Sequence, residues 1–474
     1  TILVKHPQHN GKATIHYHDI GDYLSREDKL RIIKEFYSIQ NPSIRWQILS
    51  PNEFGDWINK RSQIYDSFLP IGEKTGSSKH SFFNIYSAGV KTNRDYWCYN
   101  FSHLELKNNI ELTIATYNEE CLKYKSHQKE YTNINIENII TLDPTKISWS
   151  GDLLNSLSKL KPLSFNKKNL VVSLYRPFSK NHIYFDRILN NSTYQIPKLF
   201  PTPKHQNLVI CTTGVGDNNF SVFISDLIPD LHLIGTAQCF PLYWYDDSTA
   251  DIADLFSTSQ NDVDRYTRRD GITDWILSTA RKQYGSKVTK EDIFYYVYGI
   301  LHSPAYRKVF AVDLKKMLPR LPLVDNRDDF RAFSAAGRAL AELHLNYETI
   351  EPYKDAKVTL DPNAYINYRV EKMHFGKNGK EVDKSTIIYN NQITISKIPL
   401  KAYDYVLNGK SAIDWIMERY AVTTDNKSGI RNDPNDWAAE HNDEKYILNL
   451  LLRIITVSLE TCKIVASLPK LKLE

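Results

Sequence analysis

Apolar and polar residues alternate along the first 19 residues with the period of a β-strand. The pattern predicts a hairpin of two strands, Thr1–Lys5 and Ala13–Asp19, around a turn from Pro7 to Gly11. A lone hairpin buries too little apolar surface to be stable, so its partner strands are expected upstream of Thr1. The spacing then becomes helical, and a helix is predicted from Ser25, its N-cap, to about Ser38.

The middle of the chain carries short aromatic and β-branched runs separated by Asn, Pro and Gly. These runs fill residues 81–101 and 170–245. They are typical of short strands. Helices are predicted to interrupt them at about 104–125 and 153–159. We therefore expect a mainly β middle region.

Helical signals are stronger toward the C-terminus. Thr289 is an expected N-cap because Glu291 and Asp292 follow it, and Ser303 with Pro304 starts the next helix. Two prolines hold residues 318–323 extended. Further helices are predicted at 327–346, 411–420 and 444–467, and a small sheet at 368–375 and 385–396.

These elements predict an α+β chain in three parts. Residues 1–60 hold the hairpin and helix that end a sheet, residues 61–323 a mixed β-rich domain, and residues 324–474 a helical and β subdomain. The first boundary is placed where the pattern becomes irregular, at about 51–71. A length of 474 residues also exceeds what one hydrophobic core usually serves.

Composition indicates an ordinary globular protein. Hydrophobic residues make up 42% and charged residues 24%, and no run approaches the roughly 18 apolar residues of a membrane span. The five cysteines form no CxxC pair, and no signal peptide opens the chain. We expect a soluble, cytoplasmic protein. Because the chain begins with Thr1 inside an apolar run, we also expect a piece of a longer polypeptide.

Charge and aromatic content leave two interpretations open. The net charge of +5 could arise from one basic face or from scattered lysines. The 30 tyrosines suit a polar interface with nucleic acid or protein, and they also suit the composition bias of a low-GC genome.

The chain contains several partial catalytic motifs, and none of them is complete. Thr212–Gly216 resembles a cofactor loop, but it leads into a β-like run and not into a helix. Asp95 with Glu105 and Lys107 has the order of a nuclease triad, which also arises by chance. The remaining partial matches are His16 with His18, Gly409-Lys410-Ser411, and the Asx-Pro pairs at 41, 143, 361 and 433. By elimination, a binding module is predicted.

Several runs resemble the C-terminal specificity region of type ISP single-polypeptide restriction-modification enzymes. They lie in order at 94–102 (RDYWCYNFS), 174–178 (LYRPF), 226–232 (DLIPDLH), 238–243 (QCFPLY), 298–306, 385–390 and 432–437. The resemblance implies a bacterial polypeptide with a nuclease, a motor, an N6-adenine methyltransferase and then this region. Residues 1–60 would end a class I methyltransferase-like sheet, 61–323 would be the target-recognition domain, and 324–474 its C-terminal subdomain. S-adenosylmethionine, Mg and ATP are implied for the full-length enzyme, with no cofactor in this chain.

The implied partners are double-stranded DNA and the upstream methyltransferase and motor domains of the same polypeptide, with no membrane. Basic residues at strand ends and in loops are candidates to clamp phosphates, and loop asparagines are candidates to read adenine. The candidates are Lys91, Arg94, Arg176, Lys180, Arg187, Asn190, Asn191, Lys198, Lys204, Asn218, Asn219, Lys377, Lys380 and Lys384. Arg94 and Arg176 lie in the shared runs, so they are expected to build the scaffold or touch phosphates.

Two alternatives stay open. One is an enzyme in its own right, an adenine methyltransferase or a nuclease with a divergent site. The other is a protein-interaction scaffold that docks through the apolar stripe of residues 444–467. The DNA sequence recognised is beyond what these residues indicate.

Overall fold

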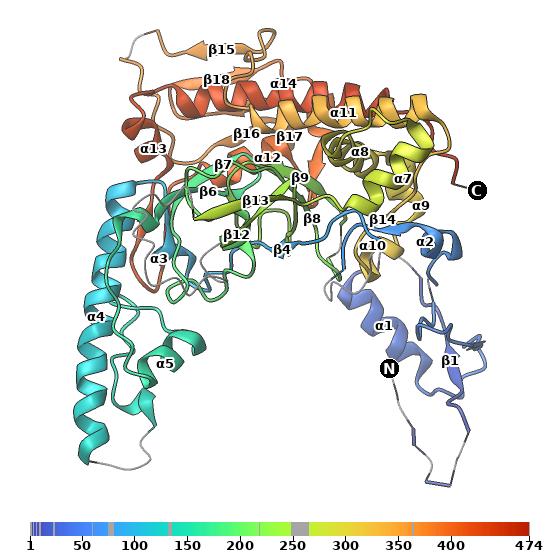
Figure 1. The fold of residues 1–474 in the computed structure, drawn as a ribbon, viewed down its shortest axis with the longest axis horizontal. Helices are drawn as coiled ribbons and strands as arrows, with labels where there is room; N and C mark the ends of the chain where they lie inside the picture. Colours follow the sequence, from blue (N-terminus) through green and yellow to red (C-terminus); the bar gives the residue numbers. More distant parts are fainter. Residues whose placement is uncertain are drawn as a thin grey trace. The chain divides into compact units, whose positions relative to one another are not determined.

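The computed structural model describes residues 2–473 except 3, 6, 9, 10, 22, 23, 59, 74–79, 131–134, 218, 248–264 and 363–364, with the backbone alone at 128–130. The chain divides into two compact units, Thr1–Tyr65 and Asp66–Glu474 (Figure 1). They are called the N-terminal unit and the main unit below.

In the N-terminal unit, β1 (Ile15–Tyr17) pairs antiparallel with β2 (Gln47–Leu49), and α1 (Arg26–Phe36) lies between them in sequence. The prediction of a hairpin with Thr1–Lys5 is wrong for the described residues of that segment, which form no strand. The cause is a non-local aromatic cluster: His18 packs on Phe36 with ring centroids 5.4 Å apart. The predicted N-cap is confirmed, since the Ser25 side chain accepts a hydrogen bond from the Asp28 amide.

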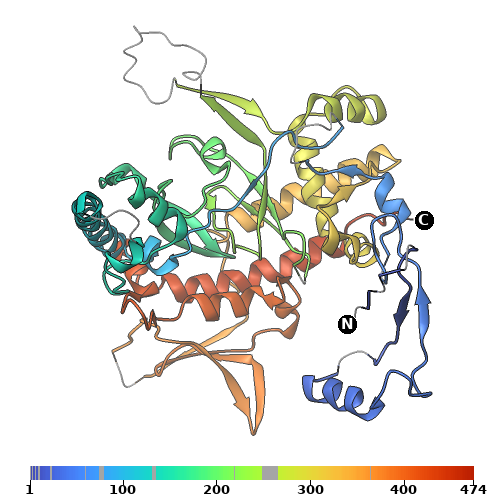
Figure 2. The ribbon, with the colours of Figure 1, turned by 90° about the horizontal axis from the view of Figure 1, so that it is seen from below.

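The main unit contains two four-stranded sheets built from the predicted β-rich middle. The first has the order β10 (Ile228–Pro229), β6 (Leu170–Arg176), β7 (Ser179–Tyr184), β5 (Tyr99–Asn100). The second has the order β4 (Ser87–Ala88), β11 (Gln238–Pro241), β8 (Val209–Thr212), β9 (Val222–Ser225). Two further pairs join β3 (Leu69–Pro70) to β14 (Arg320–Leu321) and β12 (Tyr243–Asp247) to β13 (Tyr266–Asp270). Figure 2 shows β12 and β13 extending from the unit as a ribbon.

Helices were the best predicted elements because their caps are local. Thr289 forms a capping box with Asp292, and Ser303 and Ser411 cap the helices that follow them. The pattern missed α7 and α13 and the one-turn helices α2, α3, α6 and α10. The helices after α1 are α2 (Gln63–Ser67), α3 (Asp95–Cys98), α4 (His103–Glu130), α5 (Gly151–Ser158), α6 (Ile196–Leu199), α7 (Asp274–Tyr284), α8 (Lys290–His302), α9 (Pro304–Val309), α10 (Asp313–Lys316), α11 (Arg327–Leu345), α12 (Ala412–Arg419), α13 (Pro434–Glu440) and α14 (Tyr446–Ala466).

The largest described hydrophobic core of the main unit contains residues from both sides of the predicted boundary at residue 323, and the unit is not divided there. The residues of this core run from Val90 in the β-rich part to Val457 in α14. The stripe of α14, which includes Leu450 and Leu451, is fully buried in this core. A docking role for that stripe is therefore wrong.

The C-terminal sheet was predicted in outline. Its order is β15 (Lys357–Leu360), β18 (Ile393–Ser396), β17 (Glu381–Ile388), β16 (His374–Asn378). β15 was missed. Further strand pairs are β19 (Val406–Leu407) with β20 (Lys410–Ser411) and β21 (Thr423–Thr424) with β22 (Arg431–Asn432). Within the described part of the chain, no helix is long and apolar enough to cross a membrane.

Candidate nucleic-acid interface

The predicted contact residues do not form one cluster. Figures 1 and 2 show the C-terminal sheet and the arm of α4 and α5 projecting from the main unit in different directions. Lys377, Lys380 and Lys384 are exposed on the sheet. Asn219 is exposed in the turn between β8 and β9, and Asn218 lies outside the described residues. The segment 186–204 carries Arg187, Asn190, Asn191, Lys198 and Lys204.

Segment 186–204 begins with a turn that hydrogen bonds of its own side chains stabilise. The Asp186 carboxylate accepts hydrogen bonds from the amides of Ile188 and Leu189, at 2.8 and 3.0 Å. Asn190 is fully buried; its Oδ1 accepts from the Asp186 amide at 2.9 Å and its Nδ2 donates to the Tyr184 carbonyl at 3.1 Å. The base-reading role predicted for Asn190 does not fit this buried position, where Asn190 fixes the turn that presents the exposed Arg187.

Lys91 and Asn191 connect this segment to its neighbours. The backbones of Lys91 and Ser192 exchange two hydrogen bonds of 2.9 Å, so Lys91 lies beside the segment. Asn191 donates from its side chain to Asp152 in α5. Lys198 and Lys204 are exposed further along. Three predicted cations, Arg187, Lys198 and Lys204, are thus exposed along this segment, and Lys91 pairs with its backbone.

Arg94, by contrast, is inside the protein. It is 4% exposed, and its Nη2 donates to Ser150 Oγ at 2.5 Å. Burial lowers the pKa of the Arg94 guanidinium. Its predicted contact with DNA does not fit this position, because α5 and its cap cover the group.

Arg176 is also used internally. Its Nη1 donates to Asp230 Oδ1 at 2.6 Å, its Nη2 lies 3.7 Å from Asp95 Oδ2, and its guanidinium covers the Tyr175 ring. Burial raises the pKa of Asp230 to about 6, although the Arg176 charge opposes this rise. Arg176 therefore joins β6 to the residues after β10, and its predicted contact with DNA does not fit this position.

Lys180 also forms an internal ion pair. Its Nζ donates to Glu348 Oε2 at 2.5 Å and lies 5.5 Å from the centre of the Tyr347 ring. This contact ties β7 to the segment after α11. The charge is already compensated, so Lys180 is a poor candidate for phosphate binding.

The arm carries a basic surface that the candidate list missed. Residues 153–185 contain six basic residues and no acidic one. Lys159, Lys161, Lys167 and Lys168 are exposed on the segment that returns from α5 to β6. That segment is fixed on α4, because Tyr117 Oη donates to the Lys161 carbonyl at 2.9 Å and Asn118 bonds both backbone groups of Leu163. The absence of acids in this stretch was the available signal in the sequence.

A cleft of about 950 Å³ lies beside this basic surface. Its lining combines β6 and β7 with residues 200–208 and the β12–β13 ribbon. His182 lines it and meets Glu440 at 3.1 Å; burial lowers the pKa of His182, although Glu440 opposes this. Charges of both signs, such as Arg268 and Glu291, surround the cleft. A mixed rim does not attract phosphate, so the lysines of the arm are the better candidates.

The candidate catalytic motifs are structural in this fold. In the part of the chain that the structure describes, no three His, Cys, Asp or Glu side chains converge as metal ligands. Asp95 accepts from Thr92 and Tyr175 and faces Arg176, whereas Lys107 pairs with Glu111 in α4. Thr212–Gly216 is a turn between two strands, as the sequence predicted.

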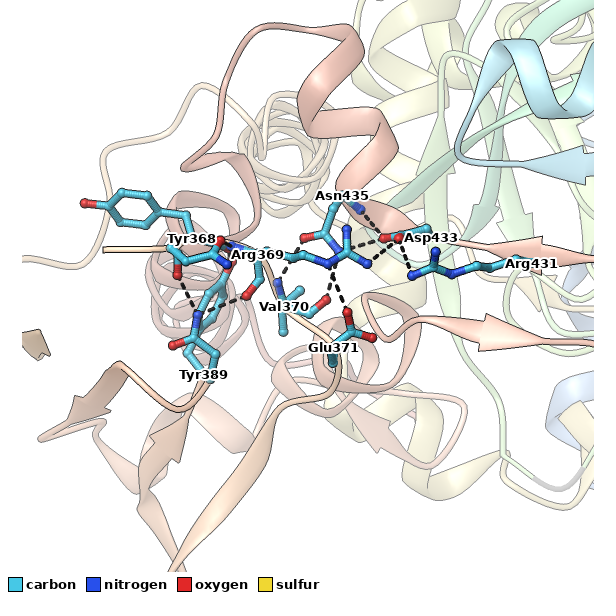
Figure 3. Close-up of polar contacts among 10 residues, drawn as sticks. Tyr368, Arg369, Val370, Glu371, Tyr389, Arg431, Asp433 and Asn435 are labelled. Carbon is cyan, nitrogen blue, oxygen red and sulfur yellow. Dashed lines mark hydrogen bonds and ion pairs between the residues drawn. The ribbon is translucent and has the colours of Figure 1, made fainter. Parts of the chain in front are cut away.

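The Asx-Pro pair at 433 starts α13, and Figure 3 shows its contacts. Buried Asp433 accepts from Arg369 at 2.5 Å and faces Arg431 at 3.0 Å. These hydrogen bonds and charges keep the pKa of Asp433 low despite its burial. Asn435 binds the amide and carbonyl of Val370 at 2.9 and 2.8 Å. These bonds occupy the groups that a methyltransferase would need for a target amine.

The fold and the exposed basic segments are those of a mixed α+β recognition module. Residues 81–450 match the family model described as the type ISP C-terminal specificity domain. The chain belongs to that family. No curated protein matches the chain.

Three solved structures are similar to this chain. A nuclease-deletion mutant of the type ISP restriction-modification enzyme LlaGI, in complex with a DNA substrate mimic, is 38% identical with a TM-score of 0.82 over 97% of this chain. The ATP-dependent type ISP enzyme LlaBIII bound to DNA is 34% identical with a TM-score of 0.84 over 100%. A DrdV–DNA complex is 27% identical with a TM-score of 0.79 over 96%. The matches cover 39%, 28% and 43% of those chains, respectively.

Proposed function

We propose that this chain selects the DNA sequence on which a type ISP restriction-modification enzyme acts. The observation that carries the proposal is family membership over residues 81–450, together with the DNA present in the LlaGI and LlaBIII structures. N6-adenine methylation and cleavage would be supplied by other domains of the same polypeptide, with S-adenosylmethionine, Mg and ATP. The N-terminal unit would then belong to the end of the methyltransferase domain.

The charged residues of the main unit support two separate roles, phosphate binding and base recognition. Exposed lysines on the arm are suited to phosphates, because their backbone is fixed and no acid lies in that stretch of sequence. Arg187 is suited to a base edge, because a guanidinium binds guanine with two parallel hydrogen bonds and its turn is held rigid by Asp186 and Asn190.

The proposal is tested by salt titration of duplex binding. The logarithm of the affinity falls linearly with the logarithm of the salt concentration, and each phosphate contact adds about 0.9 to the steepness of this fall. The double variant Lys161→Gln with Lys167→Gln should therefore make the fall shallower by about 2. Lys354→Gln is the matched control, because this exposed lysine lies between α11 and β15 and not on the arm. A wild-type affinity that does not fall with salt, or an equal loss in the control, would contradict the proposal.

Selection of bound sequences from a random duplex pool distinguishes residues that contact base edges from residues that contact phosphates. Arg187→Gln should relax the preference at one position of the selected sequence, whereas the lysine variants should weaken all sequences alike. An Arg187→Gln protein with an unchanged selected sequence would exclude Arg187 as a reader.

A further inference from the structure

The β12–β13 ribbon has two faces with different surroundings. Side chains alternate along a strand, and residues that pair across an antiparallel ribbon lie on the same face. Tyr245 and Tyr266 therefore share one face, which is called the packed face below. Tyr245 is 6% exposed and donates its hydroxyl to the Gln206 carbonyl at 2.7 Å. Both tyrosine rings contact His205, with ring centroids 4.7 and 5.2 Å away, so the packed face lies on the residues that directly follow segment 186–204.

The opposite face of the ribbon is polar. It carries Asp246, Thr267 and Arg269, and these three residues are called the open face below. The Arg269 side chain is 56% exposed and the Asp246 side chain is 48% exposed. Their charged groups are 3.8 Å apart, and an exposed ion pair of this length is weak. Both groups therefore remain available to a ligand.

Ion pairs hold the ribbon at both ends. At its base, Lys290 Nζ lies 2.8 Å from Asp270 Oδ2, and this contact ties β13 to the start of α8. At the other end, Arg265 donates two hydrogen bonds to Asp247, from Nε at 3.0 Å and from Nη2 at 2.6 Å. The open face is thus presented on a backbone that is fixed before a ligand binds, which lowers the entropy cost of binding.

The shape and the side chains of the ribbon match the major groove of duplex DNA. Paired strands lie about 4.8 Å apart, and the groove is about 12 Å wide and admits a two-stranded ribbon. Within the groove, a guanidinium can bind guanine O6 and N7, and a carboxylate can accept from the amine of the paired cytosine. The charges of Arg269 and Asp246 cancel, which favours contact with base edges over contact with phosphates. The exposed Lys204, next to His205, supplies a cation for the phosphates beside the groove.

We propose that the β12–β13 ribbon enters the major groove of the target duplex with its open face toward the bases. Arg269 binds the guanine of one G·C pair, and Asp246 accepts from the cytosine amine of the same pair, because the two groups lie only 3.8 Å apart. This inference rests on the proposed function and adds a second reading element to Arg187. It assigns specificity to residues that sequence reasoning did not select.

Selection of bound sequences from a random duplex pool tests the assignment with the full chain. Arg269→Gln should lower the discrimination for one G·C pair by about 5- to 150-fold. Asp246→Ala should relax the same position, which differs from the position that Arg187→Gln relaxes. Arg268→Gln is the matched control, because it removes the neighbouring arginine of the same strand, on the packed face, where the guanidinium lies 4.3 Å from the centre of the Tyr243 ring. The control should select the wild-type sequence.

Replacement of one atom of the duplex tests the contact with the major groove. In a duplex with the selected sequence, 7-deazaguanine in place of the guanine of that pair removes the N7 acceptor, which only the major groove displays. The wild type should bind this duplex severalfold more weakly than the unmodified duplex, whereas Arg269→Gln should bind the two duplexes equally. An equal loss of affinity in both proteins would assign the contact to another residue and overturn the inference.

The failure of the ribbon inference and the failure of the proposed function give different results. If the wild type selects a sequence with steep salt dependence, and Arg269→Gln selects the same sequence at an unchanged thermal midpoint, the inference is overturned and the proposed function stands. The same result is expected if the ribbon pairs its edge with a strand of another protein. If the wild type binds no duplex, the proposed function fails and the inference fails with it.

Discussion

Helices α8 and α11 approach most closely at two glycines, and substitution there gives the sharpest test of the fold. A Cβ at Gly337 would lie 1.9 Å from the Tyr295 carbonyl oxygen and 2.9 Å from the Gly299 nitrogen. A Cβ at Gly299 would lie 2.2 Å from the Phe333 oxygen. All three neighbours are backbone atoms, so rotation of a side chain cannot relieve the overlap.

Two opposing effects set the magnitude for Gly337→Ala. Helix propensity favours alanine by about 1 kcal/mol. Against this, bringing the Tyr295 oxygen from 1.9 Å to an ordinary 3.4 Å contact requires a displacement of 1.5 Å, which separates two helices that are packed over fully buried Phe333. Overpacking costs about 1–3 kcal/mol, and the upper end applies where backbone must move. The expected net destabilisation is about 2 kcal/mol.

The assay is urea and thermal unfolding of the wild type, Gly337→Ala and Gly299→Ala. Midpoints are compared, because two-state behaviour is not assured for a unit of this size. Gly151→Ala is the control: it opens α5, and a Cβ there meets nothing within 4 Å. The first two variants should unfold earlier and the control within about 0.5 kcal/mol of the wild type. A Gly337→Ala protein as stable as the wild type would refute the close approach.

Two further predictions concern buried charge. Burial lowers the pKa of His344 to about 3 from 6.5, so below about pH 6.5 the unfolded chain binds a proton that the folded chain does not. The free energy of unfolding should therefore rise with pH up to about 6.5, and it should be about 2 kcal/mol lower at pH 5. His344→Gln should make the plot of this free energy against pH flatter across the same range. A plot that the substitution leaves unchanged would contradict the prediction. Asp433→Ala removes the cap of α13 and the partner of two arginines, so it should lower the free energy of unfolding in urea by about 2 kcal/mol, more than Asp436→Ala in the same helix. An equal effect of the two would argue against the contacts in Figure 3.

Local rules predicted what local contacts decide. Ser25, Thr289 and Ser411 each begin a helix where the sequence placed it, because a cap needs only its own next three residues. The strand partner of Ile15–Tyr17 was missed, since the choice of Gln47–Leu49 depends on aromatic contacts made across a helix. The boundary at 323 stays a prediction, and α11 packs on α8 before it and on α14 after it.

For the candidate site, too, the sequence predicted what depends on residue type and missed what depends on the fold. Residue type indicates which side chains can bind a phosphate or a base edge, and it selected Arg187 and Arg176 alike. Whether a charge is available depends on the partners that the fold supplies: Asp230 lies 2.6 Å from Arg176, whereas Arg187 stands exposed on a turn built by its neighbours. A stretch without acidic residues carries more of this information than any single arginine, because cations with no acid nearby in the sequence have fewer internal partners. The lysines of the arm are therefore the part of the proposed interface that charge patterning alone could have located.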